Sequence, residues 1–415
     1  MDIEFNTRKK LQAFLRQISH LLLSDFPYSS SESALKLIKD YFEQALIRLD
    51  RASLASNRNV LVQTCITSNE RIRQYLPILG FLLRSTNIRN CFEAYHSFAG
   101  MASALIGPNA EVIMSSEWDF SPLTYPMNVR ILPNHVLIGM PSCESPNALV
   151  LPLAGHELGH SVWRVENLEN KWIAAVRQKA KSEMKTRWPK FIQAFSEHSV
   201  LQPTDAELAS NMFLINIQSE IAHLSLSQIE ELFCDAIGIH LFGESYAYAF
   251  HYLLAPSLGG VRSVTYPPLD FRAHLIATLS KLDLKVLGFA DYGAEFRDAQ
   301  PSLSSRDDFI CAAADDIAKN MGKEMYDEAE AIVLGKASQY VPNRESQAEI
   351  LRMFERGIPA REPKSISDIL NASWAYVRSN ANTFDENERE LIEWISEVAL
   401  KSIEVLEYRS RAKNA

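Results

Sequence analysis

The sequence has 415 residues, of which 47% are hydrophobic and 22% are charged, and its net charge is −9 at pH 7. This composition provides ample apolar material for a core and excludes an intrinsically disordered chain, while the dispersed Lys and Arg residues disfavour a nucleic-acid partner. No apolar run reaches the roughly 18 residues that span a bilayer, and the acidic start Met1–Asn6 lacks the apolar segment of a signal peptide, so we expect a cytoplasmic protein with no membrane partner.

The first hundred or so residues show the apolar periodicity of helices. Ser29–Glu32 has capping-box spacing, and the apolar positions between 34 and 46 follow on one helical face. Three further segments have similar spacing: 5–25, 69–84 and 87–105. Gly107–Asn109 is typical of a turn. We therefore predict a helical N-terminal domain over residues 1–106.

Short strands are expected after this turn. The segments 111–114, 129–132 and 135–140 are rich in Val, Ile and Leu and are separated by proline-bearing turns. They predict a small sheet at the start of a second domain, over residues 107–299.

The most informative motif is His156–Glu157–Leu158–Gly159–His160. Side chains four positions apart on a helix are offset by only about 40°, so His156 and His160 share a face and can bind one ion. Glu157 lies beside that face, where a carboxylate polarises a water that the metal activates. This HExxH pattern predicts half of a catalytic zinc site.

The residues around the motif favour a buried helix. An apolar run, 147–155, leads into it, and Pro152 suits the first turn of a helix that begins nearby. The alternative is a core helix with two hydrogen-bonded histidines, which would need separate structural reasons for both histidines and for the acid.

A catalytic zinc site needs a third protein ligand and an open position for water. Glu231 and Asp235 are four apart in a segment of helical spacing, 229–238, so they share one face, and Glu230 points elsewhere. We expect Glu231 to be the third ligand and Asp235 to accept the second ring N–H of His156. The alternative is that Glu231 is an ordinary surface acid, one of 51 Asp and Glu residues.

The separation between the two halves of the site predicts an insertion. Residues at about 168–226 read as helices that leave the active-site helix and return beside it. A helical C-terminal region is expected over 300–415, beginning after the connection 301–305 and closing with a long amphipathic helix at about 386–409. These flanks exceed what a minimal catalytic unit needs and offer a surface for a protein partner.

Five cysteines, at positions 65, 91, 143, 234 and 311, neither pair by spacing nor form a CxxC zinc site, which fits a reducing compartment. Cys234 lies between Glu231 and Asp235. It has two interpretations: a thiol close to the metal, or a small residue packed against the zinc helix, which is the more common role of such a cysteine.

The two motifs together resemble the gluzincin superfamily of zinc metallopeptidases, the thermolysin-like class with a helix-borne glutamate ligand. The sequence GESY at 243–246 and the run from Tyr266 to Arg272 also resemble uncharacterised bacterial gluzincin-like proteins. Those proteins carry Gly-Pro-x-Tyr and His-Pro-Pro with a downstream arginine, where this chain has Glu244 and Tyr266. The resemblance covers roughly residues 110–285.

The resemblance implies an α+β, predominantly α-helical fold with a thermolysin-like zinc-peptidase core, a small sheet and helical N- and C-terminal regions. It implies that Glu157 is the general base and later passes a proton to the leaving amine, with Zn²⁺ as cofactor and a peptide or protein as substrate. It also implies that an edge of the sheet holds an extended peptide beside the zinc, and the strand at 135–140 is our choice. A core strand with no exposed edge is the equal alternative.

An oxyanion donor completes such a site. Tyr246, His251 and Tyr266 are the candidates, each with ordinary packing as its alternative. For Arg272 the two interpretations are a structural ion pair near the site and binding of a substrate carboxylate. The sequence thus predicts a zinc-dependent metallopeptidase, and the alternative is a non-catalytic or tightly regulated binding protein on a gluzincin scaffold with a retained zinc site.

Overall fold

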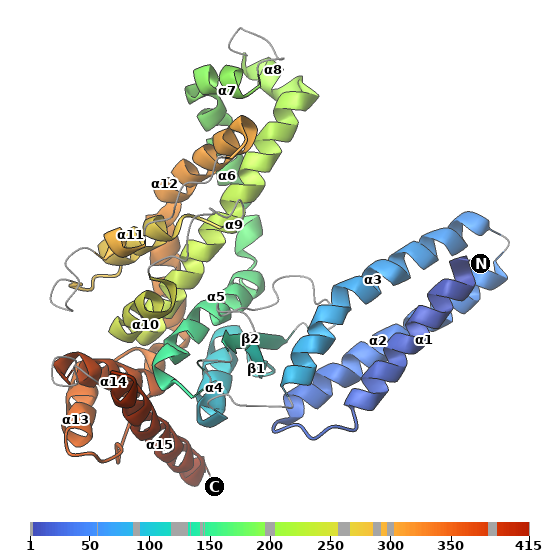
Figure 1. Cartoon of the computed structure of the whole chain (residues 1–415). Helices are drawn as coiled ribbons and strands as arrows, with labels where there is room; N and C mark the ends of the chain where they lie inside the picture. The colour runs from blue at the N-terminus through green and yellow to red at the C-terminus, as the bar shows by residue number, and fades with distance from the viewer. Residues whose placement is uncertain are drawn as a thin grey trace. The chain divides into compact units, whose positions relative to one another are not determined.

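The computed structural model describes residues 3–55, 57–85, 92–117, 132, 134–141, 144, 146–195, 204–255, 266–284, 292–296, 303–380 and 388–414. Within these ranges the chain is predominantly helical with one small sheet (Figure 1), in agreement with the predicted mainly helical α+β class. The α-helices are α1 (Ile3–Leu21), α2 (Ser29–Leu54), α3 (Arg58–Arg84), α4 (Tyr95–Ile106), α5 (Ala154–Val165), α6 (Leu168–Thr186), α7 (Trp188–Ala194), α8 (Asp205–Ser210), α9 (Met212–Phe242), α10 (Glu244–Leu254), α11 (Leu269–Leu279), α12 (Ser305–Lys336), α13 (Arg344–Phe354), α14 (Ile366–Asn380) and α15 (Glu388–Asn414). The strands are β1 (Glu111–Glu117) and β2 (His135–Pro141).

The chain divides into two compact units, Met1–Pro146 and Asn147–Ala415, in place of the three predicted domains. The predicted boundary at 106/107 falls inside the first unit because β1 packs on α2, α3 and α4. The predicted boundary at 299/300 falls inside the second because α12 lies along α9. The turn at 107–109 and the connection at 301–305, on which these boundaries were predicted, therefore lie within the two compact units.

The first unit is built on α1, α2 and α3, which pack pairwise around an apolar cluster. Phe14 and Phe42 lie at its centre, with ring centroids 4.5 Å apart. The predicted helix at 34–46 is confirmed, but the capping box is wrong. Helix α2 begins at Ser29, so Tyr28 is at the N-cap position and makes no side-chain capping hydrogen bond. Ser30 Oγ donates to the Val112 carbonyl at 2.8 Å.

Strands β1 and β2 are parallel, with Glu111 opposite His135. They confirm two of the predicted strands, and the third, at 129–132, lies outside the described residues apart from Leu132, which is buried. All seven residues of β2 are buried, and Leu137 belongs to the apolar cluster of the helices. This burial favours the core-strand alternative for β2.

The second unit is organised around α9, a single helix of 31 residues. Helices α5, α6 and α12 pack along it. The predicted insertion is confirmed as helical: α6, α7 and α8 leave the end of α5, and α9 is the returning helix. The predicted C-terminal helix corresponds to α15. Among the described helices, none is long and apolar enough to cross a membrane.

Helices α5 and α9 approach each other closely because glycines line their contact. A Cβ atom added to Gly155 would lie 2.9 Å from the Gly238 Cα, and one added to Gly159 would lie 2.7 Å from the Cys234 Cα. These contacts pair residues in opposite order, so the two helices run antiparallel. Missing side chains shorten the distance between helix axes, and this brings the acids of α9 within reach of the histidines of α5.

Replacing Gly159 with Ala should therefore be destabilising. The new methyl group would meet the backbone of α9, so we expect a loss of about 1–3 kcal/mol in the free energy of unfolding, as for other overpacked sites. Thermal unfolding measures it. The matched control is Gly335→Ala on α12, where a Cβ atom meets nothing within 4 Å and the change should be neutral or stabilising by up to about 1 kcal/mol. Equal unfolding temperatures for the two variants would contradict the close packing.

Candidate metal centre

The first half of the predicted site lies on α5. His156, Glu157 and His160 are all within this helix, and the two imidazole rings are 5.0 Å apart with their planes at 83°. The helix was predicted to begin near Pro152, and α5 begins two residues later, at Ala154. Pro152 itself belongs to a 3₁₀ helix, Ala148–Leu153, that leads directly into α5. Trp374 Nε1 donates to the Leu149 carbonyl at 3.0 Å and anchors this approach.

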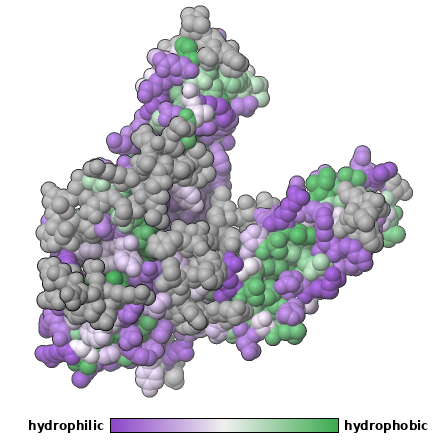
Figure 2. All heavy atoms as spheres, viewed as in Figure 1, coloured by the Kyte–Doolittle hydropathy of each residue, from purple (hydrophilic) through white to green (hydrophobic). Residues whose placement is uncertain are grey.

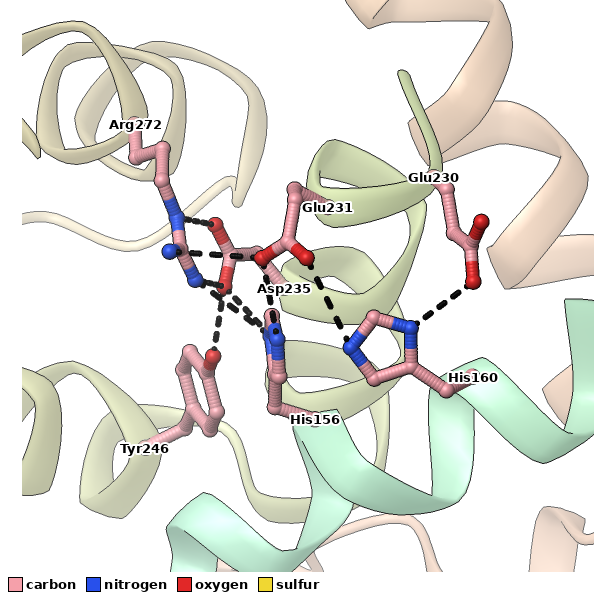
Figure 3. Close-up of polar contacts among 7 residues, drawn as sticks. All are labelled: His156, His160, Glu230, Glu231, Asp235, Tyr246 and Arg272. Atoms are coloured by element: carbon pink, nitrogen blue, oxygen red, sulfur yellow. Dashed lines mark hydrogen bonds and ion pairs between the residues drawn. The ribbon is translucent and has the colours of Figure 1, made fainter. Parts of the chain in front are cut away.

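Glu231 on α9 faces both histidines, as the helical spacing predicted. Its Oε2 lies 3.3 Å from His156 Nε2, and its Oε1 lies 3.6 Å from His160 Nε2. Figure 3 shows the three side chains pointing toward one another from the two helices. Glu231 is buried, so the alternative of an ordinary surface acid is wrong.

The other nitrogen of each ring donates to a carboxylate. His156 Nδ1 donates to Asp235 at 2.9 Å, which is the predicted pairing. His160 Nδ1 donates to Glu230 at 2.8 Å. A carboxylate behind a histidine fixes its tautomer and turns Nε2 toward a metal ion. Both histidines are therefore held in the orientation that metal ligands adopt.

Glu230 leaves the face that Glu231 and Asp235 share, as predicted, but the spacing did not predict that its carboxylate contacts His160. The contact follows from the antiparallel crossing of α5 and α9. His156 faces Asp235, and His160 lies one turn further along α5. Its partner therefore lies about one turn earlier on α9, at positions 230 and 231. Sequence spacing within one helix cannot reveal this relation, because it depends on the direction of the second helix.

Glu230→Gln should weaken zinc binding about 10- to 100-fold, the usual effect of removing a carboxylate behind a metal-binding histidine. The measurement is competition for zinc with a chelator of known affinity. Glu220→Gln is the matched control, because Glu220 lies on the same helix and pairs with Arg306 at the surface. If the two variants retain zinc equally, Glu230 does not support the site.

Asp235 is held in turn by two further side chains. Arg272 on α11 makes a two-point ion pair, with Nε 2.8 Å from Oδ2 and Nη2 2.6 Å from Oδ1. Tyr246 on α10 donates its hydroxyl to Oδ1 at 2.7 Å. Both side chains are buried. The structure thus contains the ion pair that was one of the two interpretations of Arg272, and both Arg272 and Tyr246 hold Asp235 in place. Their roles toward a substrate stay predictions.

The charges around the histidines suit a cation. Burial alone would lower the pKa of His156, but hydrogen bonds to Asp235 and Glu231 raise it to about 10. Burial alone would raise the pKa of Glu231, but the hydrogen bond from His156 and the surrounding positive charges lower it to about 2. Histidine binds metals only as the neutral ring, so a metal ion would replace these protons.

Two candidate sets of metal ligands share the histidines. The ligand atoms of His156, His160 and Cys234 lie within 4.8 Å of one another, whereas Glu231 approaches both Nε2 atoms directly. We favour Glu231. The Cys234 sulfur lies against Gly159, 3.0 Å from where a Cβ atom would be, and burial raises the pKa of this thiol, whereas metals bind the thiolate. This supports packing as the role of Cys234.

Cys65, Cys234 and Cys311 are buried and belong to no disulfide, and Cys91 and Cys143 lie outside the described residues.

Glu157 differs from the other acids of the site. It is buried, and in the described part of the chain its carboxylate makes no hydrogen bond or ion pair. Burial raises its pKa, although the charges of His156 and His160 oppose this rise. A buried carboxylate without a structural partner is costly to maintain, and a carboxylate whose pKa is raised in this way is suited to accept and release a proton.

The two remaining candidates for the oxyanion donor, Tyr266 and His251, differ in their surroundings. Tyr266 is only partly buried, with 53% of its surface exposed. This partial burial and the negative charges of Glu231 and Glu157 raise the pKa of its hydroxyl, which therefore stays protonated. The His251 ring instead packs on Tyr292 and Phe296, with centroids 6.0 and 5.7 Å away. Tyr266 therefore remains the candidate oxyanion donor.

No protein-family model matches this chain, and no curated protein or solved structure matches it either. A functional interpretation therefore depends on the residues of the chain itself, and the side chains around His156 and His160 hold the most distinctive chemistry.

Proposed function

We propose that this chain is a zinc-dependent metallopeptidase with the ligand arrangement of a gluzincin. The observation that carries the proposal is Glu157: a buried carboxylate beside the histidine pair, with a raised pKa and no structural partner among the described residues. A site that only stored or displayed a metal would have no use for this group. The glutamate from a second helix, α9, supports the thermolysin-like comparison.

The donor set fits Zn²⁺. Two imidazoles and one carboxylate form a ligand set of known catalytic zinc sites, in which a fourth position stays open. His156, His160 and Glu231 would hold the ion, and Asp235 and Glu230 would support the histidines from behind. Glu230, Glu231 and Asp235 all contact the two histidines, and Arg272 pairs with only two of these acids, Asp235 and Glu231. This excess of carboxylates favours a divalent cation.

When bound, zinc supplies Lewis acidity, which polarises a peptide carbonyl and makes a water molecule more acidic. Glu157 accepts the proton of that water on its carboxylate. Because burial raises its pKa above the usual range of a glutamate, it can release the same proton to the leaving amine. Tyr266 can donate its hydroxyl hydrogen to the oxygen that gains negative charge.

The chain also keeps its supporting groups out of the reaction. Tyr246 and Arg272 both bind Asp235, so its carboxylate stays ionised and fixed behind His156. Burial alone would raise the pKa of Asp235, but the ion pair with Arg272 and the hydrogen bond with His156 lower it well below its usual range. Asp235 therefore remains an acceptor for the ring N–H during turnover and does not compete with Glu157 for the proton.

Metal removal tests the proposal. We expect the purified chain to contain about one zinc ion, as catalytic sites of this ligand type do, and to cleave unfolded casein. Treatment with 1,10-phenanthroline should abolish cleavage, and added Zn²⁺ should restore it. Full cleavage after chelation would contradict the proposal. Bound zinc without cleavage of any peptide would instead favour the alternative, a binding protein with a retained zinc site.

A further inference from the structure

We propose that the N-terminal unit binds an acidic amphipathic helix of a partner protein in the groove between α2 and α3. This inference goes beyond the proposed peptidase activity, and it concerns the unit Met1–Pro146, which contains none of the metal-centre residues. It rests on the shape of the groove, on the small side chains of its floor and on the charge of its walls.

The groove is a long depression rather than a closed pocket. It has a volume of about 400 Å³ and is lined only by residues of α2, α3 and their connection. The lining residues run from Tyr41 to Ala55 on one side and from Val60 to Arg71 on the other. At 1.5 Å per residue these stretches are roughly 20 and 16 Å long, which is the length of a helix of three to four turns.

The floor of the groove is made of small residues. Ala45 and Ala52 are two turns apart on α2, and both are buried. Thr64 and Ser68 line the opposite side on α3. Small side chains allow another helix to approach closely, and a helix placed here would turn the three-helix arrangement of α1, α2 and α3 into a four-helix bundle.

The walls of the groove carry Arg48, Arg51 and Arg71, and none of the described residues that line it is acidic. None of the three has an acidic residue three or four positions away on its helix, and none forms an ion pair with a residue that the structure describes. Arg48 lies over the ring of Tyr41, 5.4 Å from its centroid. Arg71 donates to Gln74 at 2.6 Å.

This pattern is unusual for a chain with a net charge of −9. In the same unit, Arg8 pairs with both Glu4 and Asp50, as surface arginines commonly do. The groove arginines leave their charge available to a ligand that brings carboxylates. A positive wall facing a negative partner favours encounter and fixes orientation.

An amphipathic helix matches all three properties. Its apolar face would cover the alanine floor, and glutamates on its flanks would reach the arginines, which is the helix-in-groove mode of recognition. On the face that Figure 2 presents, hydrophobic residues gather along the N-terminal helices and hydrophilic residues border them. A small molecule fits less well, because ligand pockets enclose most of their ligand.

The test uses the full chain and a designed helical peptide of about 20 residues, long enough to span the groove. The peptide has alanine and leucine on one face and glutamate on both flanks, and a second peptide carries lysine in place of each glutamate. Fluorescence anisotropy should show binding of the acidic peptide alone. Arg48→Glu and Arg71→Glu should each weaken binding at least about tenfold.

Arg73→Glu is the matched control, because Arg73 is exposed on α3 but does not line the groove, and it should leave the affinity unchanged. Thr67→Trp places a bulky ring in the groove without a change of charge and should also abolish binding. The proposal is overturned if the two peptides bind equally, or if Arg71→Glu and Arg73→Glu have the same effect. Self-association of the chain, or binding of anionic vesicles without binding of the peptide, would also overturn it.

Discussion

Glu157→Gln should reduce peptide cleavage about 10²- to 10⁴-fold, the range that a positioned general base contributes. The amide keeps the size of the side chain but cannot take up the proton of a water molecule. Zinc content should not change, because Glu157 is not among the residues that face the two Nε2 atoms. Cleavage of casein at fixed enzyme concentration, together with metal analysis of the same sample, measures both quantities.

The stability of this variant gives an independent readout. The pKa of Glu157 is raised in the folded chain, so the folded state favours the protonated form, and the ionised form destabilises it at neutral pH. Removing the charge should therefore leave the metal-free chain equally stable or more stable at pH 7. Glu166→Gln, at the end of α5 where Glu166 pairs with Lys336, is the control and should retain activity. Wild-type cleavage by the Glu157→Gln variant would exclude Glu157 as the base.

Arg272→Met should destabilise the second unit by about 3–5 kcal/mol, because it takes from the buried carboxylates of Asp235 and Glu231 the guanidinium that pairs with both. We expect the unfolding transition of this unit to fall by about 10 °C in calorimetry. The methionine fills much of the same volume, so the loss reports mainly on charge.

Two controls separate charge from packing. The double variant Arg272→Met/Asp235→Asn removes both charges, and it should recover much of the lost stability. Arg306→Met removes an exposed ion pair with Glu220, which should cost no more than about 1 kcal/mol. A single Arg272 variant as stable as Arg306→Met would show that Asp235 is compensated by other groups.

Much of the fold follows from local patterns. The apolar periodicity of segments such as 34–46 and 386–409 predicted helices that the structure contains, because an amphipathic face is a local property of sequence. The boundaries of the two compact units could not be predicted from local patterns. The turn at Gly107 ends α4, yet β1 packs back on the preceding helices, and such long-range packing leaves no trace in the composition of a turn.

In the candidate site, too, contacts within one helix could be predicted and contacts between helices could not. The spacing of His156 and His160, and of Glu231 and Asp235, was sufficient to predict that each pair shares a helical face. The second acid, Glu230, could not be predicted from spacing, since its partner lies on another helix. Gly155 and Gly159 carried an additional signal, because glycines one turn apart permit a close helix crossing.

The crossing of α5 and α9 has a consequence for protein design. The three residues that would bind zinc and the two carboxylates behind the histidines come from one helix of 12 residues and from positions 230–235 of another, with no loop among them. Groups mounted on helices are held more accurately than groups on loops. A small artificial bundle that copies this antiparallel crossing, keeps its two glycines and adds one arginine behind the aspartate would reproduce the whole donor arrangement.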